Sequence, residues 1–271
     1  MRVISLGSGS SGNAIAIQSG QSTVLVDAGF SPRILASRLH QVGLAPSSVQ
    51  AILLTHEHSD HAGGAVAFAS NFAIPLVSDP RTLKAVCTQS SAYPGKQPSS
   101  AVERVELAVG GVAHLAGLGV RSFPTSHDAV APCGFLIYSS AWQVCIVTDT
   151  GEAQQPVIEA MREAHLVIIE ANHDRDRLLS GPYPLHLKRR ILSSTGHLSN
   201  QQASEALAST LDDGPRWVWL AHLSRTNNTP DLARVQVRDY LRQRGLGHTR
   251  IEVAPPAVGP EWDSSTLWSQ R

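Results

Sequence analysis

Residues 53–64, LLTHEHSDHAGG, place three imidazoles and two carboxylates directly after the apolar run AILL. The histidines His56, His58 and His61 and the acid Asp60 fall within six positions. Crowded imidazoles repel one another when protonated, whereas neutral imidazoles with a carboxylate are preferred ligands of zinc and similar divalent ions. The stretch therefore predicts a metal site at the end of a buried strand.

Ionisable residues also end other apolar segments that have the composition of strands. These residues are Asp27 (VLVD), His127 (FPTSH), Asp149 (CIVTD), Glu170 (LVIIE) and His222 (WLAH). One polar strand end can simply be solvated. These five together with His56 make six in one chain, which indicates that the strand ends meet in a cleft that needs charge. The distant histidines and Asp149 supply enough ligands for two metal ions, which in such sites lie about 3.5–4 Å apart.

Composition favours a folded enzyme over a disordered or strongly charged chain. Of 271 residues, 42% are hydrophobic and only 16% are charged. Lys+Arg and Asp+Glu both total 22, so there is no global basic field that would indicate nucleic-acid binding, although a local cleft can still be basic.

The three cysteines are widely spaced, and no apolar stretch has the length of a signal peptide or a membrane span. We therefore expect a cytoplasmic protein without membrane association. Its oligomeric state is left open, with a homodimer as one alternative.

Short segments rich in β-branched residues outnumber helical patterns, and several are joined by short turns. This favours an α/β fold of two mixed β-sheets with helices outside rather than one doubly wound sheet. Because no internal repeat or second-domain boundary is found, we expect one domain over residues 1–253. Residues 254–271, beginning APPAVGPEWDSS, are expected to form an irregular C-terminal tail.

The order HxHxDH, then an isolated His, Asp and His that each end a strand, resembles the metallo-β-lactamase superfamily. The resemblance implies an αββα four-layer sandwich with two metals at one edge of its sheets. One metal would be held by His56, His58 and His127. The other would be held by Asp60, His61 and His222, with Asp149 bridging the two. Asp27 would orient the ligands.

Further stretches indicate phosphodiester chemistry. GHLSNQQASEALA (196–208) and LVIIEAN (166–172) resemble ribonuclease Z, in which the equivalent His and Glu form a dyad near the scissile phosphate. By this resemblance Glu170 would orient His197, and His197 would protonate the leaving oxygen or bind the phosphate. The alternative is a buried structural His–Glu pair.

SLGSGSSGNA (5–14), EANHDRDRLLSGPYPLHLKRRI (170–191) and AHLSRTNNTPDLA (221–233) resemble the YycJ/WalJ-type metallo-hydrolases, a bacterial group assigned 5′→3′ exonuclease activity on double-stranded DNA. The resemblance implies a dinuclear metal-dependent phosphodiesterase, a 5′→3′ DNA exonuclease that uses a hydroxide bridging the metals. Its catalytic residues would be Asp60, Asp149, His197 and Glu170. Zinc is the expected metal, with manganese or iron as alternatives.

Residues near these motifs are candidates for binding DNA ends. Basic side chains can hold phosphates and a tyrosine can stack on a terminal base, although a solvated basic turn is an equal alternative. The candidates are Tyr183, Lys188, Arg189, Arg190, Ser224, Arg225, Asn227 and Asn228.

Three other functions remain open from sequence. A small-molecule (cyclic) phosphodiesterase of the same fold would use the same metal chemistry. A thioester or lactone hydrolase would need neither His197 nor the LKRR stretch. A non-enzymatic DNA-binding module with a structural metal would bind DNA regardless of substitution at Asp149.

Overall fold

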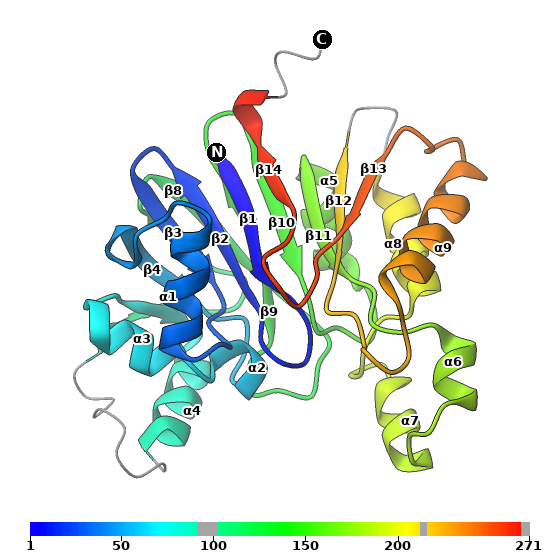
Figure 1. Ribbon diagram of the computed structural model, residues 1–271, viewed down its shortest axis with the longest axis horizontal. Coiled ribbons are helices and arrows are strands. Elements are labelled where there is room, and N and C mark those ends of the chain that lie inside the picture. Colours follow the sequence, from blue (N-terminus) through cyan, green and yellow to red (C-terminus); the bar gives the residue numbers. More distant parts are fainter. Residues whose placement is uncertain (92–101, 212–215, 267–271) are drawn as a thin grey trace.

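The computed structural model describes residues 1–91, 102–211 and 216–266. Two mixed β-sheets pack face to face, and helices lie on their outer sides (Figure 1). None of the helices in the described part of the chain combines the length and the apolar character needed to span a bilayer.

The first sheet has the strand order β14-β1-β2-β3-β4-β5-β6. Strands β3 to β6 are mutually parallel, and the remaining neighbours are antiparallel. Its strands are β1 (Arg2–Gly7), β2 (Ala14–Ser19), β3 (Ser22–Val26), β4 (Val49–Leu53), β5 (Leu76–Ser78), β6 (Arg104–Glu106) and β14 (Glu261–Asp263).

The second sheet has the order β13-β12-β11-β10-β9-β8-β7. Strands β10 to β13 are mutually parallel, and β8 runs in the same direction as β10 because both are antiparallel to β9. Its strands are β7 (Val112–Leu115), β8 (Leu118–Pro124), β9 (Cys133–Tyr138), β10 (Gln143–Val147), β11 (Leu166–Glu170), β12 (Trp217–Ala221) and β13 (Arg250–Val253).

Some of the helices begin at side-chain caps. Ser31, Ser199 and Thr229 each accept a hydrogen bond from the first turn of the helix that follows. The helices are α1 (Pro32–Gln41), α2 (Ser59–Ala62), α3 (Ala65–Phe72), α4 (Pro80–Ser91), α5 (Gln155–Glu163), α6 (Arg175–Ser180), α7 (Leu185–Ile191), α8 (Asn200–Thr210) and α9 (Pro230–Arg242), and Pro46–Ser48 forms a 3₁₀ turn.

Alternating side chains along the strands build three apolar layers. In β11, Leu166 and Ile168 pack between the sheets, while Val167 and Ile169 pack against helices α5, α8 and α9. In β3, Leu25 packs against the layer of α1, α3 and α4. The order helix, sheet, sheet, helix confirms the predicted αββα sandwich.

The strands that precede the expected site residues all point the same way within their sheets. These strands are β3 and β4 in the first sheet and β8, β10, β11 and β12 in the second. Asp27, Asp149 and His222, directly beyond three of them, have positive φ values of 63°, 55° and 54°. Non-glycine residues in this region cost about 1–3 kcal/mol each, and such strain concentrates at functional sites. The sharp turns direct these side chains toward a common edge.

The C-terminal segment differs from the expected irregular tail. β14 pairs antiparallel with β1, Val3 lies opposite Trp262, and the Trp262 side chain is buried in the layer between the sheets. A three-residue strand carries too little periodicity to be found by pattern, and its partner lies at the other end of the chain. Residues 261–263 are therefore part of the sandwich, and residues 267–271 of the expected tail lie outside the described residues.

Candidate metal centre and catalytic site

Residues 56–61, called here the 56–61 loop, run from the end of β4 into the first residues of α2 and are fixed by backbone contacts. The N–H of Asn13 donates to the carbonyl of Asp60 at 2.7 Å, and the N–H of Ala28 donates to the carbonyl of His61 at 2.7 Å. A Cβ at Gly29 would lie only 1.8 Å from the Asp60 carbonyl, so glycine is required where the two chain segments meet. The loop is thereby held with its imidazoles facing the strand ends of the second sheet.

The structure brings six of the seven expected ligands together in two sets of three. Ligand atoms of His56, His58 and His127 lie within 4.8 Å of one another. The same holds for those of Asp60, His61 and His222. These are the two groupings that the sequence resemblance implied, and the ends of β4, β8 and β12 contribute to them.

Asp149 lies between the two sets. Its Oδ2 is 2.9 Å from Nε2 of His61, and its Oδ1 is 3.8 Å from Nε2 of His127. Because Oδ1 also lies 3.5 Å from Nδ1 of His222, the carboxylate as a whole contacts histidines of both sets, which suits a group placed between two cations.

The donor set fits divalent metal ions. Nε2 of His56 is buried and has no hydrogen-bond partner among the described residues, although burying an unpaired polar atom is unfavourable. Its Nδ1 lies 3.0 Å from the Thr55 hydroxyl, which fixes the ring. Burial, together with repulsion from His61, lowers the pKa of His56 well below its ordinary value, so this imidazole is neutral and can offer a lone pair.

The buried carboxylates require positive charge nearby. Burial alone would lower the pKa of His222, but the carboxylate of Asp149 and hydrogen bonds to Asp60 and Glu170 raise it to about 10. Burial would likewise lower the pKa of His61, but the carboxylates of Asp149 and Asp27 raise it well above its usual value. Imidazole protons balance the carboxylates here, and divalent cations would replace those protons on binding.

Asp27 supports the 56–61 loop. Its Oδ1 accepts a hydrogen bond from the N–H of Thr55 at 2.9 Å, and its Oδ2 lies 2.7 Å from Nδ1 of His61. A hydrogen bond from Nδ1–H to this carboxylate leaves Nε2 of His61 for a cation and fixes the ring orientation.

Asp27→Asn is expected to weaken metal binding by about 10- to 100-fold, because the partner that orients His61 loses its charge. Asparagine tolerates the positive φ of this position, so the fold should persist. Competition with a chromophoric chelator measures the affinity, and circular dichroism checks the fold. Unchanged metal affinity would show that Asp27 does not act through His61.

Glu170 is a fully buried carboxylate shared by two histidines. Its Oε1 lies 2.7 Å from Nδ1 of His197 and 3.1 Å from Nδ1 of His222. Its Oε2 accepts hydrogen bonds from the N–H groups of Thr150 and Leu198. Burial alone would raise the pKa of Glu170, but His197 and His222 hold it at about 2. Glu170 is already satisfied by protein groups, which suits a carboxylate that orients the two rings. It also lies within ligand distance of His197, His222 and Asp149.

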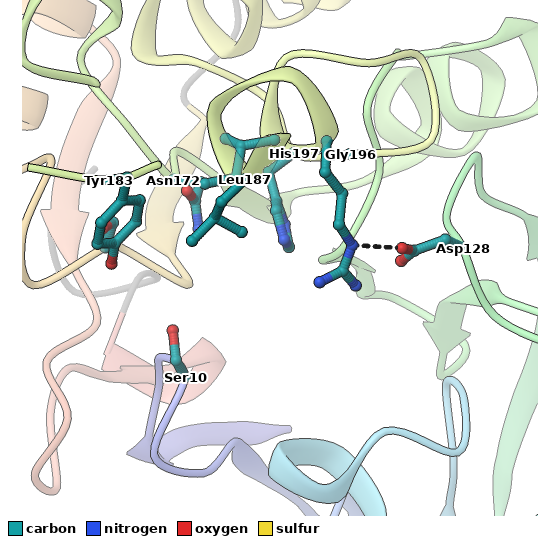
Figure 2. Close-up of a pocket in the computed structure, with 10 residues that line it drawn as sticks. Ser10, Asp128, Asn172, Tyr183, Leu187, Gly196 and His197 are labelled. Atoms are coloured by element: carbon teal, nitrogen blue, oxygen red, sulfur yellow. Dashed lines mark hydrogen bonds and ion pairs between the residues drawn. The ribbon is translucent and has the colours of Figure 1, made fainter. Parts of the chain in front are cut away.

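His197 lies at the boundary between the metal cluster and a cavity. Its side chain is 19% exposed, and because Nδ1 faces Glu170, Nε2 is the nitrogen available to a substrate. The cavity is also lined by Tyr183, Arg190 and Ser224, three of the expected substrate-binding residues. Figure 2 shows Tyr183, Leu187 and His197 on one side of the cavity and Ser10 opposite them.

The other expected substrate-binding residues do not line this cavity. The Lys188 ammonium donates to the Leu179 carbonyl at 2.7 Å, Arg189 is exposed, and Arg225 donates to Ser11. Asn227 and Asn228 are buried, which corrects their expected role in binding DNA ends. Asn228 hydrogen-bonds the Ala171 carbonyl and the side chain of Asn200, so it holds the fold together.

The LKRR stretch belongs to helix α7 and is not a turn. The helix places Leu187 and Arg190 on the side that lines the cavity. Residues three apart share a helix face, which explains why Arg190 reaches the cavity and its neighbours do not.

Several site residues were not found from sequence. Asn13 Nδ2 lies 3.0 Å from Nε2 of His61, and Asn172 donates to the His222 carbonyl at 2.9 Å. Asp128 lines the cavity with Ser10 and Asn172. Asp128 directly follows His127, so adjacency to a ligand was the available signal.

Comparisons with known proteins agree with this geometry. A family model described as "Beta-lactamase superfamily domain" matches residues 22–223. The chain is 37% identical over 242 residues to "Exodeoxyribonuclease WalJ" of Streptococcus pneumoniae, which covers 89% of this chain and 88% of the relative. It is 34% identical over 242 residues to "Exodeoxyribonuclease YycJ" of Bacillus anthracis, which covers 89% of each chain.

The fold also matches a solved structure. The crystal structure of the metallo-beta-lactamase fold protein YhfI from Bacillus subtilis superposes with a TM-score of 0.70. The match covers 97% of this chain and 99% of that chain at 18% identity, so it bears on the fold alone. The family match over residues 22–223 contains all seven clustered ligands, and the chain accordingly belongs to the beta-lactamase superfamily, as one of its hydrolases.

Proposed function

We propose that the chain is a two-metal phosphodiesterase that digests DNA from its 5′ ends. The observation that carries the proposal is the position of His197, which contacts Glu170 behind it, borders the metal cluster at Asp149 and lines the cavity in front. The identity to relatives named exodeoxyribonucleases over 89% of the chain supports DNA as the substrate.

The proposed roles follow from the contacts of each residue. Divalent ions held by the seven ligands would lower the pKa of water and neutralise charge on the phosphoryl oxygens. Hydrolysis adds a water oxygen to phosphorus and breaks the bond to the leaving oxygen, which must gain a proton. His197, whose Nδ1 is held by Glu170, would donate this proton from Nε2. Asp149, which contacts histidines of both sets, would help to hold the ions and would accept the proton of the attacking water.

The chemistry favours zinc as the resident metal. Five imidazoles and two carboxylates are ligands that zinc accepts readily, and manganese or iron are the alternatives to be tested. Metal-stripped protein reconstituted separately with zinc and with manganese would distinguish them.

End-labelled DNA and RNA test the substrate and the direction of digestion. We expect reconstituted protein to release nucleotides from the 5′ ends of DNA duplexes, and metal-stripped protein to release none. Release from 3′ ends would overturn the proposed polarity. Cleavage of a chromogenic bis-ester without cleavage of DNA would assign the site to a small phosphodiester instead.

A further inference from the structure

One ion pair lies on the lining of the proposed substrate cavity beside the metal cluster. The guanidinium Nε of Arg190 lies 2.6 Å from Oδ2 of Asp128, and both residues line the cavity (Figure 2). Asp128 belongs to the loop after β8 and Arg190 to α7, so the pair joins two separate walls. Oδ1 of Asp128 is 3.4 Å from Nε2 of His127, which places the pair next to an expected metal ligand.

The surroundings of Arg190 are otherwise basic. The segment 174–191, which contains α6 and α7, has five Arg or Lys residues and two Asp residues. Arg175, Arg177 and Arg189 have no ion pair among the described residues. Asp128 is therefore the acidic group that faces the guanidinium on the cavity wall, and it comes from a different element.

A carboxylate and a phosphate seek the same donors of an arginine. Asp128 accepts from Nε of Arg190, so a phosphate that takes the paired donors Nε and Nη2 of the planar guanidinium must displace this carboxylate from Nε. The side chains of Asp128 and Arg190 are 35% and 56% exposed. Exposed ion pairs contribute little to stability, so replacement of Asp128 by another anion costs little.

We propose that Asp128 occupies, in the free protein, the position on Arg190 that a DNA phosphate takes in the complex. The inference rests on the proposed function and adds that the Asp128 carboxylate competes with the DNA phosphate for Arg190. Binding of a phosphate separates Asp128 from Arg190, and the carboxylate opposes any ligand that cannot replace it. Asp128 thus sets how strongly a DNA end must bind before the cavity accepts it.

Equilibrium binding to a fluorescent DNA duplex tests the exchange. The metal-loaded protein is titrated against a duplex with phosphorothioate linkages at its ends, and fluorescence anisotropy gives Kd. Asp128→Asn keeps the shape of the side chain and removes its charge. We expect Kd to fall by about fivefold, the upper range for an exposed ion pair. Arg190→Gln should raise Kd.

A matched control removes the same charge elsewhere. Asp231, 84% exposed in its side chain, pairs with Arg234 at 2.7 Å on α9 and does not line the cavity. Asp231→Asn should leave Kd nearly unchanged. In an Arg190→Gln background, Asp128→Asn should lose most of its effect, because the competition acts through the guanidinium. Thermal melting confirms that each variant is folded.

The outcomes separate this inference from the proposed function. Wild-type binding with no tightening in Asp128→Asn, or an equal gain in Asp231→Asn, overturns the inference alone. If Asp128→Asn tightens DNA binding equally in the Arg190→Gln background, the inference is overturned as well. General repulsion between Asp128 and DNA would then explain the tighter binding without Arg190. Absence of duplex binding in every variant would refute the DNA substrate and, with it, the inference.

Discussion

Asp60→Ala is expected to halve the bound metal and abolish phosphodiester cleavage. Oδ2 of Asp60 lies 3.2 Å from Nε2 of His222 and 3.5 Å from Nε2 of His61, so it belongs to only one of the two ligand sets. Loss of this carboxylate leaves two imidazoles and Asp149 there, which hold a cation weakly. Elemental analysis of dialysed protein gives the metal per chain, and end-labelled duplex DNA gives the rate.

Asp231→Ala serves as the control, because this exposed aspartate lies on α9 and belongs to neither ligand set. It should retain wild-type metal content and activity. The two-metal proposal is contradicted if Asp60→Ala keeps its full metal content. It is also contradicted if this variant loses half of its bound metal and still cleaves DNA at the wild-type rate.

His197→Ala is expected to slow cleavage by about 10²- to 10⁴-fold while metal content stays the same. The ring contacts Glu170 through Nδ1 and lies at the cavity, so its removal deletes a proton donor without deleting a ligand of either set. Burial would lower the pKa of His197, but the carboxylates of Glu170 and Asp149 raise it. A donor must be protonated, so the wild-type rate should fall as pH rises through this raised pKa.

The pH profile separates a proton donor from a structural residue. His197→Ala should lose the alkaline decline along with most of its rate, whereas a purely structural role would lower the rate equally at every pH. Glu170→Gln provides the comparison. Because Glu170 also contacts His222, this variant should lose metal affinity as well as rate. Wild-type turnover in His197→Ala would show that His197 and Glu170 have no catalytic role.

The sandwich and most of its strands could be predicted from local patterns. Segments such as VLV before Asp27 and LVII before Glu170 are continuous apolar runs, as strands buried on both faces require. Short elements were missed because a sequence pattern needs several residues to show its period. α6 and α7 have six and seven residues and β14 has three, so neither the helical nor the strand period extends far enough to be recognised.

The chain itself determined which side chains are available as ligands and that they follow apolar strands, because residue identity and strand periodicity are local properties. Local patterns did not decide which of them meet: the family resemblance implied the two groupings, and only the tertiary structure gives their distances. Pairing of the strands within each sheet and packing of the sheets placed Asp149 between two ligand sets and divided Glu170 between His197 and His222. The same packing buried Asn228 and paired Asp128 with Arg190 across 62 positions of sequence. Such distances depend on contacts between remote segments, which no local pattern encodes.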